Sequence, residues 1–242
     1  MSRVKRLSYC CIAALTGYAG LAAMQVYAAE PAKHVVTSPA STAARWASRL
    51  DGFRLQDAKS PATPGGTLFV GSSSIDFWKT LDADFGSSHP INRGIAGAEL
   101  SDCVELFSEL VAPYAPSRIV LYAGDNDLAA GKSPEQVAAE LNSFLAKVSE
   151  KLPGTNVAYI SIKPSPSRRA LLPKIDKSNR LARSLSARYP QMTYIDVYSP
   201  MLDPTGAPRA DLFRADALHM NEKGYAIWAR QLHNFLAPQG SI

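Results

Sequence analysis

Short apolar runs alternate with amphipathic helical patterns along most of the chain. The apolar runs are typical of buried strands and cover 67–71 (TLFVG), 118–124 (RIVLYAG), 156–162 (NVAYISI) and 193–197 (TYIDV), with a further strand expected near Ile91. Apolar residues at helical spacing predict helices over 41–58, 99–112 and 175–188, and two more after the capping residues Ser133 and Asn221. Strands that alternate with helices predict an α/β fold of three layers (α/β/α), in which helices cover both faces of a parallel sheet.

The first 28 residues differ in composition from the rest of the chain. A basic start, MSRVKR, precedes a mostly apolar run from Leu7 to Val26, and small residues precede a cleavage point after Ala28. This pattern predicts a signal peptide over 1–28, a flexible tether over 29–40 and a single domain over 41–242. An uncleaved membrane anchor is the alternative, because the apolar run is nearly long enough to span a bilayer.

The predicted leader and the net charge bear on where the protein is located and what it binds. A cleaved signal peptide predicts an exported protein, periplasmic or secreted, with no stable membrane association after cleavage. The net charge of +5 arises from 26 basic and 21 acidic residues, but three basic residues and no acidic one lie within the first 28, so the remainder carries only +2. This small excess gives no support to nucleic-acid binding. Cys103 is the single cysteine after the leader, which excludes an intramolecular disulfide.

Polar residues follow the predicted strands, at the positions where parallel sheets bind their ligands. Three consecutive serines (72–74) follow the first strand, and a serine at such a turn can present its oxygen at a helix N-terminus. The stretches 92–97 (NRGIAG) and 124–127 (GDND) follow two further strands. Asp216 and His219 stand three residues apart near the C-terminus, where the carboxylate can orient the imidazole.

Over roughly residues 65–236 the sequence resembles the SGNH hydrolase superfamily, which includes the GDSL-type esterases. The matching blocks are Gly71-Ser72-Ser73-Ser74, Gly97, Gly124-Asp125-Asn126-Asp127 and Asp216-Ala217-Leu218-His219. The resemblance implies a flavodoxin-like sheet of about five parallel strands and hydrolysis of acyl esters through a covalent acyl-enzyme. Ser72 stands where the family more commonly has Asp, so the nucleophile is ambiguous among the three serines. The third position of the block, counted from Gly71, is Ser73, which we predict to be the nucleophile.

The resemblance and the residue chemistry together predict a role for each site residue. His219 takes the proton from the Ser73 hydroxyl, and Asp216 holds the imidazole and stabilises its charged form. The backbone N–H groups of Ser73 and Gly97 and the side-chain amide of Asn126 receive the oxyanion. No metal or other cofactor is expected, because the four histidines occur without HExxH or CxxC spacing.

The sequence leaves the substrate and the reaction class partly open. Small-molecule or carbohydrate esters with short acyl or acetyl groups are expected, because the mature chain has no long lid insertion and no broad exposed apolar helix. An acyltransferase on the same fold, or an inert module that binds carbohydrate or lipid, is the alternative. Four basic residues could line the pocket and favour anionic substrates, but a solvent-exposed position is expected for them: Arg93, Lys163, Arg168 and Arg214.

Overall fold

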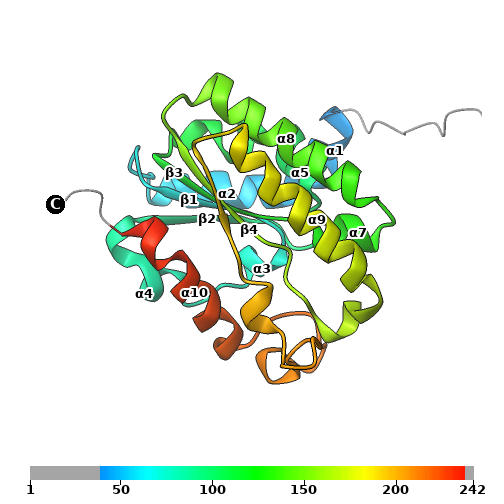
Figure 1. Ribbon diagram of the computed structural model, residues 1–242. Coiled ribbons are helices and arrows are strands. Elements are labelled where there is room, and N and C mark those ends of the chain that lie inside the picture. Colours follow the sequence, from blue (N-terminus) through cyan, green and yellow to red (C-terminus); the bar gives the residue numbers. More distant parts are fainter. Residues whose placement is uncertain (1–38, 238–242) are drawn as a thin grey trace, which may run out of the picture. The chain divides into compact units, whose positions relative to one another are not determined.

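The predicted strands assemble into one five-stranded parallel sheet in the computed structural model of the chain, which describes residues 39–237 (Figure 1). The strands are β1 (Thr67–Gly71), β2 (Pro90–Gly94), β3 (Arg118–Tyr122), β4 (Asn156–Ile160) and β5 (Met192–Ile195). Their order across the sheet is β2-β1-β3-β4-β5, and every neighbouring pair is parallel. This order is the flavodoxin-like one, so the predicted fold is confirmed.

Helices connect the strands and lie on both sides of the sheet (Figure 1). The α-helices are α1 (Pro39–Arg45), α2 (Ala47–Lys59), α3 (Ser73–Asp76), α4 (Leu81–Phe85), α5 (Leu100–Glu105), α6 (Phe107–Leu110), α7 (Asp125–Ala129), α8 (Pro134–Lys151), α9 (Leu172–Ser184) and α10 (Glu222–Leu236). The short 3₁₀ helices are η1 (Gly86–Ser88), η2 (Ala112–Tyr114), η3 (Pro166–Leu171), η4 (Leu185–Ala187), η5 (Ser199–Met201) and η6 (Ala210–Leu212).

The side chains of the central strands alternate between two hydrophobic cores, one on each face of the sheet. On β1, Leu68 and Val70 belong to one core, whereas Phe69 between them belongs to the other. Buried residues of α2, α5, α6, α8 and α9 complete the first core, and those of α3, α4 and α10 complete the second. The described residues therefore have the three layers that the hydrophobic pattern predicts.

Two of the predicted helices are each divided into two shorter ones. The segment 41–58 forms part of α1 and most of α2, with a break at Trp46, and the segment 99–112 contains α5 and α6, with a break at Leu106. The ψ angles of Trp46 and Leu106, 9° and 17°, lie outside the helical range and change the direction of the backbone. Apolar side chains on both sides of each break still reach the core, so their spacing in the sequence could not reveal the breaks.

Three predicted strands extend too far at their carboxyl ends. Strand β5 ends at Ile195, two residues before the predicted end at Val197. Strand β3 ends at Tyr122, and Gly124, with φ = +120°, directly precedes α7. Strand β4 ends at Ile160, and the N–H of Ile162 donates to the side chain of Asn179 (2.8 Å) instead of to a neighbouring strand. The residues beyond the ends of β3 and β4 form loops at the same edge of the sheet, where a ligand site is expected.

The N-terminal predictions fall almost entirely outside the described residues. The signal peptide predicted over 1–28 and the tether before Pro39 are not described, so both stay predictions. Pro39 and Ala40, the last two residues of the predicted tether, instead belong to α1. The described residues all fall within one compact unit. No helix within 39–237 is both long enough and apolar enough to cross a bilayer.

Candidate active site

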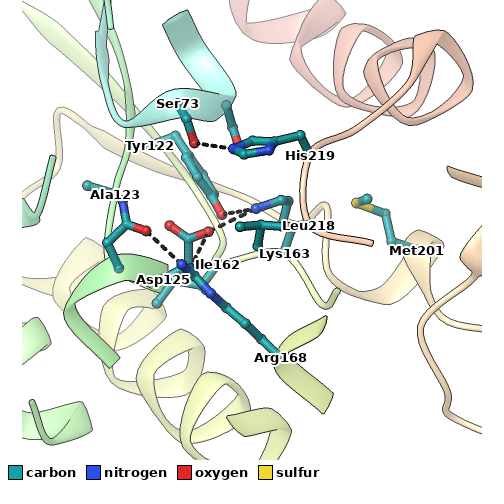
Figure 2. A network of polar contacts seen from close by, with 12 residues as sticks. Ser73, Tyr122, Ala123, Asp125, Ile162, Lys163, Arg168, Met201, Leu218 and His219 are labelled. Atoms are coloured by element: carbon teal, nitrogen blue, oxygen red, sulfur yellow. Dashed lines mark hydrogen bonds and ion pairs between the residues drawn. The ribbon is translucent and has the colours of Figure 1, made fainter. Parts of the chain in front are cut away.

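Ser73 is the member of the serine triplet that faces a candidate base. Gly71 lets β1 and β3 approach closely just before the triplet, because a Cβ there would lie 1.9 Å from a carbonyl oxygen of β3. Ser72 and Ser74 are buried, with exposed fractions of 0% and 1%, and neither Oγ has a hydrogen-bond partner. Ser73 begins α3, and its Oγ lies 3.0 Å from Nε2 of His219 (Figure 2).

The loop from Asp216 to His219 orients the imidazole. Oδ2 of Asp216 lies 2.7 Å from Nδ1 of His219, and Oδ1 accepts the backbone N–H groups of Leu218 and His219, each at 2.9 Å. Ala217 adopts φ = +56°, the left-handed conformation that makes this turn tight. The N–H of Leu218, followed by the His219 side chain, lowers the pKa of Asp216 below its ordinary value. An ionised carboxylate favours the imidazole proton on Nδ1, an arrangement in which Nε2 can accept the Ser73 proton.

Three groups that can donate to an oxyanion follow β1, β2 and β3. The N–H of Ser73 is the first of α3, and helix N-termini leave such groups without an intrahelical acceptor. Gly97 has φ = +84°, and within the described residues neither its N–H nor that of Ser73 donates a hydrogen bond. Asn126 lies on α7, and one N–H of its amide donates to the carbonyl of Ala98 (2.9 Å). The second N–H of that amide is left for a ligand.

A buried group of charged residues, which the strand pattern did not predict, contacts Asn126 through Arg168. Figure 2 shows its members Asp125, Lys163 and Arg168. Asp125 and Lys163 are 4% and 2% exposed, and Nζ of Lys163 donates to Oδ2 of Asp125 (2.8 Å) and to the Tyr122 hydroxyl (3.1 Å). Arg168 places Nη1 2.9 Å from the same oxygen of Asp125 and donates from Nη2 to Oδ1 of Asn126 (2.7 Å). Burial raises the pKa of Asp125, but the charges of Lys163 and Arg168 outweigh burial and lower it. The signal in the sequence was a charged residue beyond each of two neighbouring strands, β3 and β4.

The four basic residues expected to be solvent-exposed lie in different environments. Arg93 is 5% exposed and pairs with Asp57 of α2, so its expected exposure is wrong. Lys163 is buried in the charged group, which also contradicts the expectation, and Arg168 is partly buried there. Arg214 is exposed, as expected. Buried cations need a charged partner, and the fold supplies a carboxylate from a distant part of the chain to both Arg93 and Lys163.

A pocket of about 530 Å³ opens beside His219. Phe77 lines it and packs edge-on against the imidazole of His219, with the ring centroids 5.0 Å apart. Arg214 also lines it, and its backbone N–H donates to the carbonyl of His219 (2.8 Å). Neither the candidate oxyanion donors nor Ser73 and His219 line this pocket, which adjoins the imidazole through Phe77 and Arg214. Its lining carries three cations and one anion: Lys79, Arg214, Lys223 and Glu222.

Asp127, the last residue of the GDND stretch, has a structural role in the fold. Asp127 is 0% exposed, and its carboxylate accepts the backbone N–H of Leu100 (3.0 and 3.1 Å) and Nζ of Lys132 (2.9 Å). Asp127 therefore ties α7 to the start of α5. Within residues 39–237, no group of three or more His, Cys, Asp or Glu side chains is arranged to hold a metal ion.

A serine, an imidazole and a carboxylate in hydrogen-bond contact, at the carboxyl end of a five-stranded parallel sheet, define a hydrolase of the SGNH type. Residues 63–227 match the GDSL-like Lipase/Acylhydrolase family, and the chain belongs to this family. The resemblance carried by the sequence blocks is therefore confirmed, and the protein is a hydrolase. No curated protein matches the sequence.

Solved structures with the same fold include three of bacterial origin. A candidate platelet activating factor from Streptococcus pneumonia is 22% identical, with a TM-score of 0.70 over 80% of this chain and 94% of that one. A GDSL-like lipase from Bacteroides thetaiotaomicron is 20% identical, with a TM-score of 0.65 over 77% and 96%. A mutant of an acetyl-xylooligosaccharide esterase from Geobacillus is 14% identical, with a TM-score of 0.60 over 75% and 98%. At these identities the likeness establishes the shared fold.

Proposed function

We propose that the protein is a serine esterase that hydrolyses short acyl esters through a covalent acyl-enzyme. The observation that carries this proposal is the chain of contacts from Ser73 Oγ to His219 Nε2 (3.0 Å) and from Nδ1 to Asp216 (2.7 Å). A neutral imidazole can accept a serine proton at that distance. The other two serines of the triplet are buried and have no such partner, which supports Ser73 as the nucleophile.

The reaction consists of two half-reactions with the same proton carrier. In the first, His219 takes the Ser73 proton as Oγ bonds to the acyl carbon, and the oxyanion accepts hydrogen bonds from the candidate donors described above. The bond between the acyl carbon and the alcohol oxygen then breaks, and His219 gives its proton to that oxygen. In the second half-reaction water replaces the alcohol, and release of the acid restores Ser73.

The scarcity of exposed apolar side chains favours a short acyl group. Among the large hydrophobic side chains of residues 39–237, Leu55 on α2 is the exposed one, at 64%. A single exposed apolar residue gives no continuous apolar surface of the kind that binds a fatty acyl chain. The Geobacillus enzyme of the same fold is described as an acetyl-xylooligosaccharide esterase, which makes acetylated sugars suitable test substrates.

The alcohol part of the ester occupies the pocket beside His219. Because His219 must protonate the departing alcohol oxygen, the alcohol lies on the imidazole side of Ser73, where Phe77 and Arg214 line the pocket. Three cations against one anion in the lining favour an alcohol that carries a negative charge, such as a sugar acid. The proposed substrates are therefore acetate or similarly short esters of polar, preferably anionic alcohols.

The acyl part of the proposal is tested with p-nitrophenyl esters of increasing chain length. Acetate should give the highest kcat/KM and longer chains lower values, whereas Ser73→Ala should abolish both hydrolysis and covalent labelling by an organophosphonate. Ser74→Ala is the matched control, because its hydroxyl is buried and has no partner. Hydrolysis that survives in Ser73→Ala, or a label found on Ser74 by mass spectrometry, would contradict the proposal.

The alcohol part is tested with two acetate esters, 3-acetoxybenzoate and 3-acetoxybenzamide, which differ in the charge of the alcohol. The protein should hydrolyse the anionic ester with a kcat/KM higher by roughly threefold to tenfold, and the preference should shrink at high salt. Arg214→Gln should reduce the preference, while Lys151→Gln, the same change of charge at the end of α8 and outside the pocket lining, should not. Equal rates for both esters would refute an anionic alcohol.

A further inference from the structure

Asn126 can stabilise an oxyanion only when the nitrogen of its amide, and not the oxygen, faces the nucleophile. In the structure Nδ2 of Asn126 donates to the carbonyl of Ala98 (2.9 Å), and Oδ1 accepts from Nη2 of Arg168 (2.7 Å). A guanidinium can only donate and a carbonyl oxygen can only accept, so a reversed amide would face a like group at both ends. Arg168 and Ala98 together therefore fix which end of the amide is turned toward the site.

Arg168 is itself held in place by the buried charged group. Its side chain is 14% exposed, and Nη1 lies 2.9 Å from Oδ2 of Asp125, to which Nζ of Lys163 also donates at 2.8 Å (Figure 2). The backbone N–H of Ser167 donates to the carbonyl of Ala217 (3.0 Å), so the segment that carries Arg168 is tied to the loop that orients the imidazole. The position of Arg168 is therefore coupled to both the oxyanion side and the base side of the site.

The charged group also brings an unbalanced charge close to Asn126. Lys163 and Arg168 are positive and Asp125 is negative, so the three carry a net charge of +1. Because all three side chains are largely buried, this charge is screened less than a surface charge would be. Donation from the guanidinium to Oδ1 polarises the amide and strengthens the remaining N–H of Asn126 as a donor. Both effects favour the anionic intermediate over the neutral ester.

We propose that Arg168 is a positioning residue of the oxyanion hole, which holds the Asn126 amide with its nitrogen toward Ser73 and supplies a positive charge behind it. This inference rests on the esterase function proposed above and adds a residue to its machinery. Arg168 acts through Asn126 rather than on the ester, and Asp125 and Lys163 keep the guanidinium in position.

The first test compares p-nitrophenyl acetate hydrolysis by variants of Arg168. Arg168→Met should lower kcat by about 10- to 100-fold with KM changed less than about threefold, because the lost effect acts on the transition state. Arg168→Lys should recover part of the loss, since an ammonium can still donate to Oδ1 of Asn126. Arg169→Met is the matched control, because the neighbouring side chain is exposed, and kcat there should stay within about twofold.

A double-mutant cycle separates positioning of Asn126 from a general structural role. Asn126→Ala alone should lower kcat by about 10² to 10³. Arg168→Met in that background should cause a clearly smaller further loss than in the parent, because the amide that Arg168 orients is gone and only the effect of its charge remains. Two fully additive losses would overturn the proposal. So would a kcat of Arg168→Met within twofold of the parent value in protein shown by thermal melting to be folded.

Binding of phenylboronic acid distinguishes failure of this inference from failure of the esterase function. The boronate forms a tetrahedral adduct on Ser73 that needs the oxyanion donors but no turnover. Its Kd, measured by calorimetry, should rise at least about tenfold in Arg168→Met and stay unchanged in Arg169→Met. A parent protein that shows this pattern without hydrolysing esters would refute the esterase function alone. If the parent hydrolyses esters but the boronate Kd is the same in Arg168→Met, the positioning role is refuted. A parent protein that neither hydrolyses esters nor binds the boronate would refute the esterase function and the positioning role together.

Discussion

Replacing Asp216 by Asn tests whether the carboxylate acts by fixing the imidazole tautomer. Oδ1 of Asp216 accepts two backbone N–H groups at 2.9 Å each, and Oδ2 lies 2.7 Å from Nδ1 of His219. The Asn side chain has the same shape, and its oxygen can keep both backbone contacts, so its NH₂ group must face Nδ1. A donor at that place moves the ring proton to Nε2, and the ring then faces Ser73 with a donor instead of a base.

The expected loss in kcat for Asp216→Asn is up to about 10⁴, or about 5.5 kcal/mol of transition-state stabilisation. The free energy of unfolding should change by less than about 1 kcal/mol, because the Asp216 side chain is 47% exposed and the turn keeps its acceptor. Asp216→Ala is the informative comparison. It removes the acceptor of both N–H groups and should cost about 1 to 2 kcal/mol of stability, as the loss of a helix cap does, with a loss in kcat no larger than that of Asp216→Asn.

Three measurements on the parent protein and on both Asp216 variants test whether the carboxylate fixes the imidazole tautomer. Hydrolysis of p-nitrophenyl acetate gives kcat, thermal unfolding gives stability, and ¹⁵N NMR of the His219 ring shows which nitrogen carries the proton. The parent should carry it on Nδ1 and Asp216→Asn on Nε2. A kcat of Asp216→Asn within about tenfold of the parent value would refute the reasoning. A ring proton that stays on Nδ1, or activity losses that follow the losses in stability, would refute it as well.

Three further predictions concern the serine triplet, the oxyanion loop and the leader. Ser72→Ala should keep hydrolysis and labelling and should not lower Tm, because its buried Oγ has no partner to lose; a loss of activity like that of Ser73→Ala would contradict this. Gly97→Ala and Gly65→Ala each place a Cβ at φ = +84° and should each cost about 1 to 2 kcal/mol. Only Gly97→Ala should lower kcat, because strain at Gly97 turns the peptide that carries the donor N–H. Gly65 is the control, because it precedes β1 at the end of the strand far from the site. Equal kcat values for the two variants would show that the Gly97 N–H is not part of the oxyanion hole. Protein recovered from the envelope of an expressing bacterium should begin at Ala29 and be soluble by N-terminal sequencing of the fractions, and an intact N-terminus in the membrane pellet would support an anchor instead.

Local patterns in the sequence were sufficient to predict the layers and the edge of the sheet that carries the candidate site. Buried parallel strands are continuous apolar runs, such as 67–71, because helices cover both faces. Parallel strands also end at one edge, so polar residues placed just after them must gather there. Ser73 and Asn126 lie at that edge by this rule, because they follow β1 and β3 directly. His219 lies far beyond the end of β5, and the long segment before α10 brings it to Ser73.

Tertiary structure decided which serine of the triplet faces the imidazole. Consecutive residues of a helix point about 100° apart, so three adjacent hydroxyl groups cannot all face one partner. The rotation of α3 is set by its packing on β2, where Gly94 approaches so closely that a Cβ would lie 2.2 Å from the backbone nitrogen of Asp76. That contact joins two elements with separate local patterns, and the sequence alone does not specify their distance.

Tertiary structure also decided the environment of the charged residues. A lone cation in the sequence is predicted to be solvated, because burying it without a partner costs several kcal/mol. Lys163 is buried nevertheless, since β4 lies next to β3 and brings it within 2.8 Å of Asp125, and Arg93 is buried against Asp57 of α2. The free energy of such a charge depends on a partner many residues away. Hydrophobic periodicity reports which face of an element is buried, but a buried charge depends on which elements become neighbours, and only the assembled fold determines that.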